Sequence, residues 1–262
     1  MFTILMSLAL AAEPSPTTGV VKSVYDGDTV TLESGVKIRL KWANTPEMKP
    51  KEPCAEEARD NTTRMLLGQT VTLTVDQSAA HDGYGRLLAS IKVGDQDLSM
   101  TLLERGLAHV YLIPPIDGDP KPYLEAQERA RAAGLCIWAT DRFRGPLHIT
   151  SFHANAPGDE SVDPNLEYLR LANVSSGDFN IEGYRITDVS GNSWKLPKLV
   201  VPAGNTLIVR SGKGGDEMDP SHQLVVHLGS DGPIWNNTYD KCVILAPDGS
   251  VVDSEEYHGA AK

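Results

Sequence analysis

Apolar and polar positions alternate in short stretches through the first half of the chain, and helical spacing of apolar residues separates some of these stretches. Strand-like alternation occurs at residues 19–25, 29–32, 37–42, 70–75 and 87–93. Helical spacing predicts helices at 54–67, 97–106 and 123–133. Five strands with a helix between the third and the fourth predict an OB-type β-barrel with helices, an α+β unit.

The second half carries strand-like patterning throughout. Helical patterning stops at Trp138, and short stretches separated by Gly, Pro, Asn and Asp follow. Strands are predicted at 147–153, 166–173, 178–187, 192–196, 205–210, 223–228, 241–246 and 250–257. Regular short strands with turn residues between them predict an all-β sandwich, so the chain has two domains with a boundary between Thr140 and Leu147. At 262 residues the chain is long enough for two cores.

Residues suited to phosphate chemistry are concentrated around the first strands. Asp28 follows an Asp-Gly turn, so its carboxylate is fixed on strand backbone and can bind a hard cation. Alternation in the third strand places Lys37, Arg39 and Lys41 on one face, from which Arg39 can approach Asp28 across the hairpin. Pro46 stiffens the next segment, which carries Glu47, a candidate general base for activating water.

The stretch from about Thr18 to Trp138 resembles the thermonuclease (staphylococcal nuclease-like) domain. The family pattern is D-G-D-T, an arginine on the next strand, D-T-P-E and a later Y-G-R. The corresponding residues here are Asp26 to Thr29, Arg39, Asn44 to Glu47, and Tyr84 to Arg86. Each piece alone has an ordinary explanation as a turn, a solvated strand residue or a helix start. Their occurrence together, in family order, predicts a nuclease domain at 18–141.

The resemblance implies a calcium-dependent phosphodiesterase that acts on DNA and RNA. Calcium would be held by Asp28, Asn44 and the Thr45 carbonyl, with Asp26 just outside these ligands. The implied reaction breaks the bond between phosphorus and the 5′-oxygen, leaves 3′-phosphates, and favours single strands.

The same resemblance implies roles for the remaining residues of the pattern. Glu47 would activate water, and Arg39 and Arg86 would stabilise the negative charge that grows on the phosphoryl oxygens. Tyr84 and Lys49 would contact the substrate. We expect a monomer.

Asn44 departs from the family, which usually has an aspartate at this position. An amide oxygen can still bind calcium, but it brings no formal charge, and charged ligands tune affinity in such sites. We therefore expect weaker calcium binding than an aspartate would give.

Residues 147–258 resemble the lamin-tail domain. The resembling segments are Glu167 to Asn173, Ile181 to Asp188, Leu196-Pro197, Val201 to Gly204, Trp235 to Asn237, and Gly249 to Asp253. The resemblance implies an immunoglobulin-like sandwich that binds or positions and carries no chemistry. Five histidines of this half lack metal-ligand spacing and are interpreted as surface or strand positions: His148, His153, His222, His227 and His258.

The cysteines give information on whether the protein works in an oxidising compartment. Cys54 opens the first predicted helix and Cys136 follows the last. By the resemblance these regions pack together, so an exported copy could join them, closing a loop of about 80 residues for about 3–5 kcal/mol. Two buried free thiols are the alternative, and Cys242 is expected in the core.

The beginning of the chain indicates export. Residues 2–12 form a short apolar run that ends in a small-residue cleavage pattern, which predicts a signal peptide at 1–11 and a secreted or periplasmic product. The run lacks a basic start and is short, so upstream residues or another role for the segment remain alternatives. It is too short to span a bilayer, and no other stretch is long enough.

Charge limits how the substrate can be held. The formal net charge is −11, and neither half is basic. This disfavours a structural nucleic-acid binder that relies on general phosphate neutralisation, whereas a hydrolase that releases its product tolerates it. Attraction would come from a bound cation and from Lys37, Arg39, Lys41, Lys49 and Lys51.

Two other functions are compatible with parts of this pattern. One is a non-catalytic nucleic-acid or cell-surface binding protein with an attenuated barrel, against which the retained acids and arginines argue. The other makes the second domain primary, anchoring the chain to surface polymer. Because all candidate catalytic residues precede residue 142, we expect hydrolysis to persist without the second domain.

Overall fold

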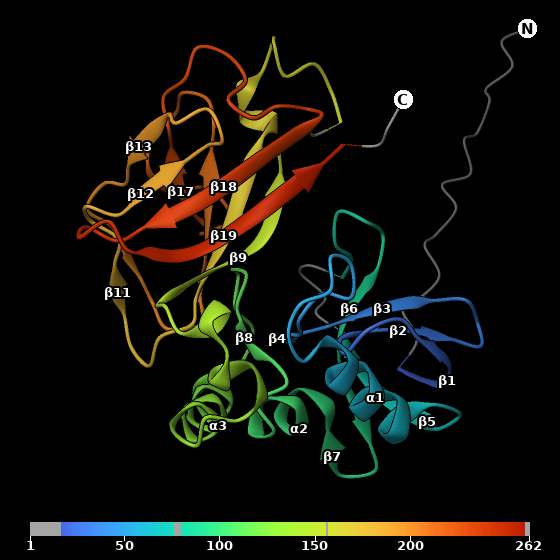
Figure 1. The fold of residues 1–262 in the computed structure, drawn as a ribbon. Helices are drawn as coiled ribbons and strands as arrows, with labels where there is room; N and C mark the ends of the chain where they lie inside the picture. The colour runs from blue at the N-terminus through green and yellow to red at the C-terminus, as the bar shows by residue number, and fades with distance from the viewer. Residues whose placement is uncertain (1–16, 76–79, 156, 260–262) are drawn as a thin grey trace, which may run out of the picture.

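The computed structural model describes residues 17–75, 80–155 and 157–259, and contains a barrel and a β-sandwich packed side by side (Figure 1). The expected signal peptide at 1–11 lies outside the described residues. Within the described part, no helix is long and apolar enough to cross a membrane.

The barrel closes because its first and last strands meet. The strands lie in the order β3-β2-β1-β5-β6, and β3 pairs in parallel with β6. Their bounds are β1 (Thr18–Val24), β2 (Thr29–Leu32), β3 (Lys37–Leu40), β5 (Thr70–Val75) and β6 (Leu87–Val93), with β7 (Gln96–Asp97) beside β6. Alternate residues such as Val30, Ile38 and Ile91 are buried in the core. The predicted OB-type barrel is confirmed.

Helices pack against the barrel strands and against one another. They are α1 (Ala55–Leu66), α2 (Leu98–Glu104) and α3 (Lys121–Ala132), close to the predicted ranges. Asp97 immediately precedes α2, and its carboxylate caps the helix by accepting a hydrogen bond from the Met100 N–H at 3.0 Å.

The third predicted strand, 37–42, is shorter than expected. β3 ends at Leu40, and Trp42 adopts a left-handed backbone conformation with φ of 72°. The chain turns there into β4 (Trp42–Asn44), which pairs with β8 (His109–Tyr111), a strand that the sequence pattern did not predict. This pairing sets Asn44 opposite His109.

The second unit is a sandwich of two sheets. One sheet has the order β16-β17-β15-β10-β9, and the other has the order β13-β12-β18-β19. The strands of the first sheet are β9 (Leu147–His153), β10 (Tyr168–Asn173), β15 (Thr206–Arg210), β16 (Glu217–Met218) and β17 (Leu224–His227). Those of the second are β12 (Arg185–Thr187), β13 (Ser193–Lys195), β18 (Tyr239–Leu245) and β19 (Val251–His258). The short strands β11 (Phe179–Asn180) and β14 (Val200–Val201) pair at one end.

The sandwich agrees with the predicted immunoglobulin-like fold in type but differs in its strand limits. The predicted strand at 178–187 is divided between β11 and β12, because Gly183 adopts φ of 85° and interrupts it. Leu171 and Ile244 pack in one hydrophobic core that joins the two sheets, and Cys242 is buried there as expected.

Backbone hydrogen bonds join the barrel unit to the sandwich. The Leu112 N–H donates to the Gly204 carbonyl at 2.9 Å, and the Thr206 N–H donates to the Leu112 carbonyl at 3.1 Å. Gly204 has φ of 73°, and a Cβ atom there would lie 2.7 Å from the Val110 Cγ1 atom. The close approach of the two units therefore requires a glycine at this position.

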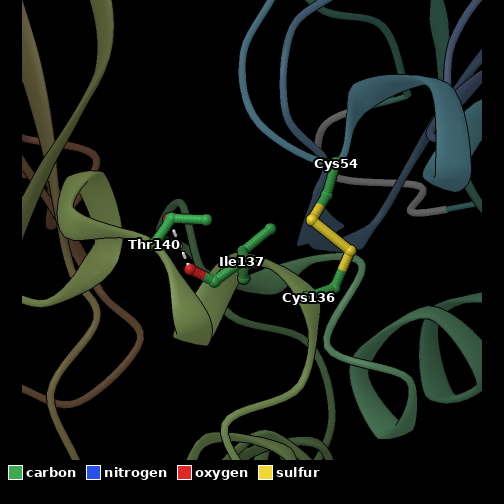
Figure 2. Close-up of a disulfide and its surroundings, with 4 residues drawn as sticks. All are labelled: Cys54, Cys136, Ile137 and Thr140. Atoms are coloured by element: carbon green, nitrogen blue, oxygen red, sulfur yellow. Dashed lines mark hydrogen bonds between the residues drawn. A yellow bond between two sulfur atoms is a disulfide. The ribbon is translucent and has the colours of Figure 1, made fainter.

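A disulfide joins the start of α1 to the segment after α3. Cys54 and Cys136 are bonded, with their Cα atoms 6.0 Å apart and a sequence separation of 82 (Figure 2). Next to Cys136, the Thr140 hydroxyl donates to the Ile137 carbonyl at 2.6 Å and closes the short turn that leads toward the sandwich.

Candidate active site

The turn before β2 brings the first acidic residues into the barrel wall. The Asp28 N–H donates to the Asp26 Oδ1 atom at 3.1 Å. A Cβ atom on Gly27 would lie 2.5 Å from the Thr45 side chain and 2.8 Å from Ala58 of α1. Because the backbone approaches these neighbours so closely, only glycine fits between the two aspartates.

The Asp28 carboxylate is held on both oxygens. Its Oδ2 atom accepts from the Thr45 N–H at 2.8 Å and from the Thr45 hydroxyl at 3.0 Å. Its Oδ1 atom accepts from the Thr29 hydroxyl at 3.1 Å and lies 3.2 Å from the Arg39 Nε atom. The side chain is thus fixed in one orientation, as a ligand or electrostatic anchor needs to be.

Arg39 is buried between this carboxylate and the next loop. Its Nη1 atom donates to the Leu40 carbonyl at 2.7 Å and to the Ala43 carbonyl at 2.9 Å, and its Nη2 atom donates to the Asn44 Oδ1 atom at 2.5 Å. A guanidinium has five N–H groups. Contacts within the described part of the chain therefore leave one Nη2 hydrogen without an acceptor.

Asn44 lies between Arg39 and a histidine that is completely buried. Burial lowers the pKa of His109 to about 3, so its ring is neutral. Its Nδ1 atom lies 2.9 Å from the Val110 carbonyl and donates to it, and its Nε2 atom is then an acceptor, 3.3 Å from the Asn44 Nδ2 atom. The Asn44 amide can form both hydrogen bonds, because its oxygen accepts from Arg39 and its nitrogen donates to His109. A carboxylate could not donate.

Acidic groups crowd together in this site. Burial, and after it the charge of Asp28, raise the pKa of Asp26 to about 7. Glu47 is an exposed residue, yet the surrounding protein desolvates its carboxylate and, together with the charges of Asp28 and Asp26, raises its pKa to about 7. Arg39 opposes both shifts but carries a single positive charge. The site has an excess of negative charge that a divalent cation would neutralise.

The available donors suit a hard cation. In the described ranges no group of three or more His, Cys, Asp or Glu side chains is arranged to hold a metal ion. A cation here would therefore take neutral oxygens beside carboxylates. Oxygens of both kinds occur here: those of Asp28 and Asn44 accept hydrogen bonds from Thr45 and Arg39 in this structure, and the Thr45 carbonyl and the Asp26 carboxylate lie beside them. Oxygen donors of mixed charge are those that calcium accepts.

A second carboxylate fixes the loop that carries Glu47. The Glu47 N–H donates to the Glu52 Oε2 atom at 2.8 Å, and the Glu52 N–H donates to the Glu47 carbonyl at 2.9 Å. The other Glu52 oxygen forms an ion pair with the Arg142 Nη2 atom at 2.6 Å. Arg142 also contacts the sandwich strand β19, where it donates to the Ser254 carbonyl and pairs with Glu255. The sandwich thus anchors the loop of the candidate base, an arrangement that the sequence did not reveal.

Arg86 reaches the site from the loop at residues 82–86. Asp82 accepts from the backbone N–H groups of Tyr84 and Arg86 at 2.9 Å each, and from the Arg86 Nε atom at 2.7 Å. The Arg86 Nη1 atom lies 3.3 Å from the Thr29 hydroxyl, which in turn donates to Asp28. Three guanidinium N–H groups have no acceptor within the described residues, so Arg86 is better able than Arg39 to bind a phosphate.

Not every residue that the sequence predicts at the site lies in the acidic cluster. Lys49 is exposed on the loop after Glu47 and forms no ion pair with the acidic residues in the part of the chain that the structure describes. Sequence reasoning missed Glu52, His109 and Arg142. Glu52 follows Glu47 by five residues, a spacing that gives little signal without the folded loop.

The cleft beside Glu47 has one wall from each unit. Asn44, Glu47, Pro50 and Glu52 line it from the barrel. The sandwich contributes strands β9 and β19, through residues 148–152, Glu255 and Glu256.

Comparison with known proteins agrees with this geometry. Residues 37–140 match the model of the staphylococcal nuclease homologue family, and residues 142–259 match that of the lamin tail domain. The chain is 33% identical over 126 residues to a thermonuclease of Staphylococcus intermedius, covering 45% of this chain and 74% of that protein. It is 32% identical over 123 residues to a thermonuclease of Staphylococcus hyicus, covering 44% and 72%. It is also 30% identical over 122 residues to endonuclease YncB of Bacillus subtilis, covering 44% and 58%.

The aligned regions thus cover slightly under half of this chain, while a second family model accounts for the remainder of the described fold. The barrel fold, the carboxylate–arginine cluster and the sequence matches all indicate the same family for the first domain. The chain belongs to the staphylococcal nuclease homologue family and carries a lamin tail domain after its nuclease domain.

Proposed function

We propose that this protein is a calcium-dependent nuclease that hydrolyses phosphodiester bonds of DNA and RNA, with a preference for single strands. The observation that carries the proposal is one charged cluster: Arg39 pairs with Asp28, Glu47 lies close enough for both charges to shift its pKa, and Arg86 reaches the Thr29 hydroxyl beside Asp28. The named relatives are nucleases and endonucleases, which supports the same reaction class. A non-catalytic binding protein would not need a carboxylate, fixed arginines and an open cleft in this arrangement.

In the proposed reaction, water attacks phosphorus while Glu47 accepts the proton that the water loses. A new bond forms between the water oxygen and phosphorus and the bond to the 5′-oxygen breaks. The 5′-oxygen takes up a proton from solvent and leaves as a 5′-hydroxyl, and a 3′-phosphate remains on the other product. Desolvation raises the pKa of Glu47, which makes its carboxylate a stronger proton acceptor than a free glutamate. Calcium, when bound, would neutralise phosphate charge and make its coordinated water more acidic.

The arginines stabilise the charge that develops during attack. Arg86 offers its unused N–H groups to two phosphoryl oxygens, and Arg39 adds its remaining Nη2 hydrogen from the Asp28 side. Both are held by protein acceptors before substrate arrives, so little reorganisation is required in the transition state. No element of the cleft reads base edges, so base specificity should be low.

The direct test is digestion of a labelled single-stranded oligonucleotide with calcium and with a chelator. We expect cleavage with calcium alone, and products that carry a 3′-phosphate, which phosphatase treatment converts to a form that a polymerase can extend. Equal cleavage in chelator would reject calcium dependence. An intact oligonucleotide under both conditions would reject the proposed activity.

We further propose that the protein is exported. The apolar N-terminal run with its cleavage pattern and the disulfide between Cys54 and Cys136 support an oxidising compartment. The test is N-terminal sequencing of the protein isolated from the medium or periplasm of its host. A mature chain that begins after residue 11 is expected, and an intact N-terminus on cytosolic protein would contradict export.

A further inference from the structure

A tyrosine at the rim of the nuclease site contacts the sandwich. Tyr84 is 71% exposed, and its ring lies beside Arg86, with 5.4 Å between the guanidinium carbon and the ring centroid. Its hydroxyl lies 3.3 Å from the Nε2 atom of His153, at the end of β9. The candidate phosphate site therefore continues onto the five-stranded sheet of the sandwich.

Three neighbouring strands of that sheet present a row of polar side chains. Tyr168 of β10 pairs in register with His153 of β9 on one side and with Arg210 of β15 on the other. The His153 and Tyr168 rings are stacked, 4.3 Å apart, and the Arg210 guanidinium lies 5.9 Å from the Tyr168 ring centroid. Leu169 is fully buried in the core, so its neighbours Tyr168 and Arg170 lie on the outer face of the sheet.

Arg170 and Arg210 keep their charges available. The Arg170 Nη1 atom donates to the Gln223 side chain at 2.9 Å, and the Arg210 Nη1 atom donates to the Asn165 carbonyl. Neither arginine forms an ion pair with a carboxylate in the part of the chain that the structure describes. Burial lowers the pKa of His153, and the charge of Arg170 lowers it further, so Arg170 lies close to the row and the histidine is neutral. The Asp219 carboxylate lies within Coulombic reach of Arg210, so this face carries two arginines and one nearby carboxylate, a local positive excess in a chain of net charge −11.

We propose that Tyr84, His153, Tyr168, Arg170 and Arg210 form a subsite for the single-stranded nucleic acid that flanks the scissile phosphate. The proposal rests on the proposed nuclease function and extends the substrate site onto the lamin tail domain. A base stacks on the exposed Tyr84 ring, and the phosphates that follow bind Arg170 and Arg210. Aromatic faces beside backbone-neutralising cations are the combination that binds single strands without base specificity.

The test compares long and short substrates in an arginine variant. Arg170→Gln combined with Arg210→Gln removes both charges and keeps hydrogen-bonding groups of similar reach. Arg185→Gln is the matched control, because Arg185 lies on β12 of the other sheet and bonds Ser193. For a 20-nucleotide single strand we expect kcat/KM to fall about tenfold through KM in the double variant, with less than a twofold change in the control. A dinucleotide does not reach the sheet, so its hydrolysis should be affected far less.

Binding separates this proposal from the proposed activity. We would measure fluorescence anisotropy of the same 20-nucleotide strand in chelator, where no hydrolysis is needed. Loss of two phosphate contacts should reduce the magnitude of the slope of log K against log salt by about 1.4, at about 0.7 per contact. An unchanged slope and KM, or equal losses on the 20-mer and the dinucleotide, would overturn the subsite. Failure of the parent to cleave, with the slope change present, would instead count against the nuclease proposal alone.

Discussion

Arg142 connects the sandwich to the candidate catalytic loop, and its replacement gives the most specific prediction about how the two units work together. Its guanidinium lies 2.6 Å from Glu52 and 3.8 Å from Asp253, and also pairs with Glu255. The three acidic side chains are 8%, 2% and 18% exposed. Arg142→Gln would leave these carboxylates close together without a cation.

The expected cost follows from burial. Removing one partner of a buried charge pair costs about 3–5 kcal/mol, because the remaining charge stays desolvated and unpaired. With a urea m-value of about 2 kcal/mol/M, the unfolding midpoint should fall by about 2 M. Turnover should fall as well, since Glu52 would no longer be held where it accepts the Glu47 N–H.

Two further variants make the experiment interpretable. Arg144→Gln removes an ion pair with Asp141 in which both side chains are largely exposed, 76% and 88%, so we expect a stability change within about 0.5 kcal/mol. Arg142→Lys keeps the positive charge but loses the planar guanidinium with its several N–H donors, so its stability and cleavage rate should lie between those of Arg142→Gln and the parent. The assays are urea unfolding followed by tryptophan fluorescence and the initial rate of oligonucleotide cleavage. If Arg142→Gln matches Arg144→Gln in both, the anchoring role is refuted.

The remaining predictions concern the site itself and the disulfide. Arg86→Ala should remove about 2–4 kcal/mol of transition-state stabilisation, measured as a fall in kcat/KM, with little change in folding stability. A fall in kcat/KM of less than about tenfold would place the phosphate elsewhere. Asn44→Asp should lower the calcium concentration for half-maximal activity about tenfold, a change of ~1.4 kcal/mol. The same variant should lose about 1–3 kcal/mol of stability, because the buried His109 acceptor then lacks a donor. A melting curve checks the stability change. A calcium titration checks the first prediction, and an unchanged calcium requirement would remove Asn44 from the ligands. Reduction of Cys54–Cys136 should destabilise the protein by about 4–5 kcal/mol for a closed loop of this length, and an unchanged urea midpoint in reductant would contradict this.

Local sequence patterns were sufficient for the architecture of both domains. Alternation and helical spacing depend on residues near one another in the chain, and they located the barrel strands and the sandwich. The error at Trp42 arose because a left-handed residue and the pairing of β4 with β8 depend on contacts more than 60 residues away in sequence. Residue types and order also indicated Asp28, Arg39 and Arg86, whose contacts the structure supplies.

Features that join the two domains could not be read from local patterns. Arg142 meets Glu255 across a separation of 113 residues, and His148, interpreted from the sequence as a surface or strand position, is buried and bonds Asp253 at 2.9 Å. The expectation that hydrolysis persists without residues 142–262 assumed that the domains are independent. The ion pair between Arg142 and Glu52 argues against that assumption, because the second domain then holds the loop of the candidate base.

The measurement that tests the central claim most directly is the initial rate of single-stranded DNA cleavage by Glu47→Gln in saturating calcium. Glutamine keeps the shape of the side chain but cannot accept the proton of the attacking water. We predict that turnover falls by about 10²–10⁴-fold, the range contributed by general base catalysis, while the melting temperature stays close to that of the parent. A folded Glu47→Gln protein that cleaves within about tenfold of the parent rate would contradict the account.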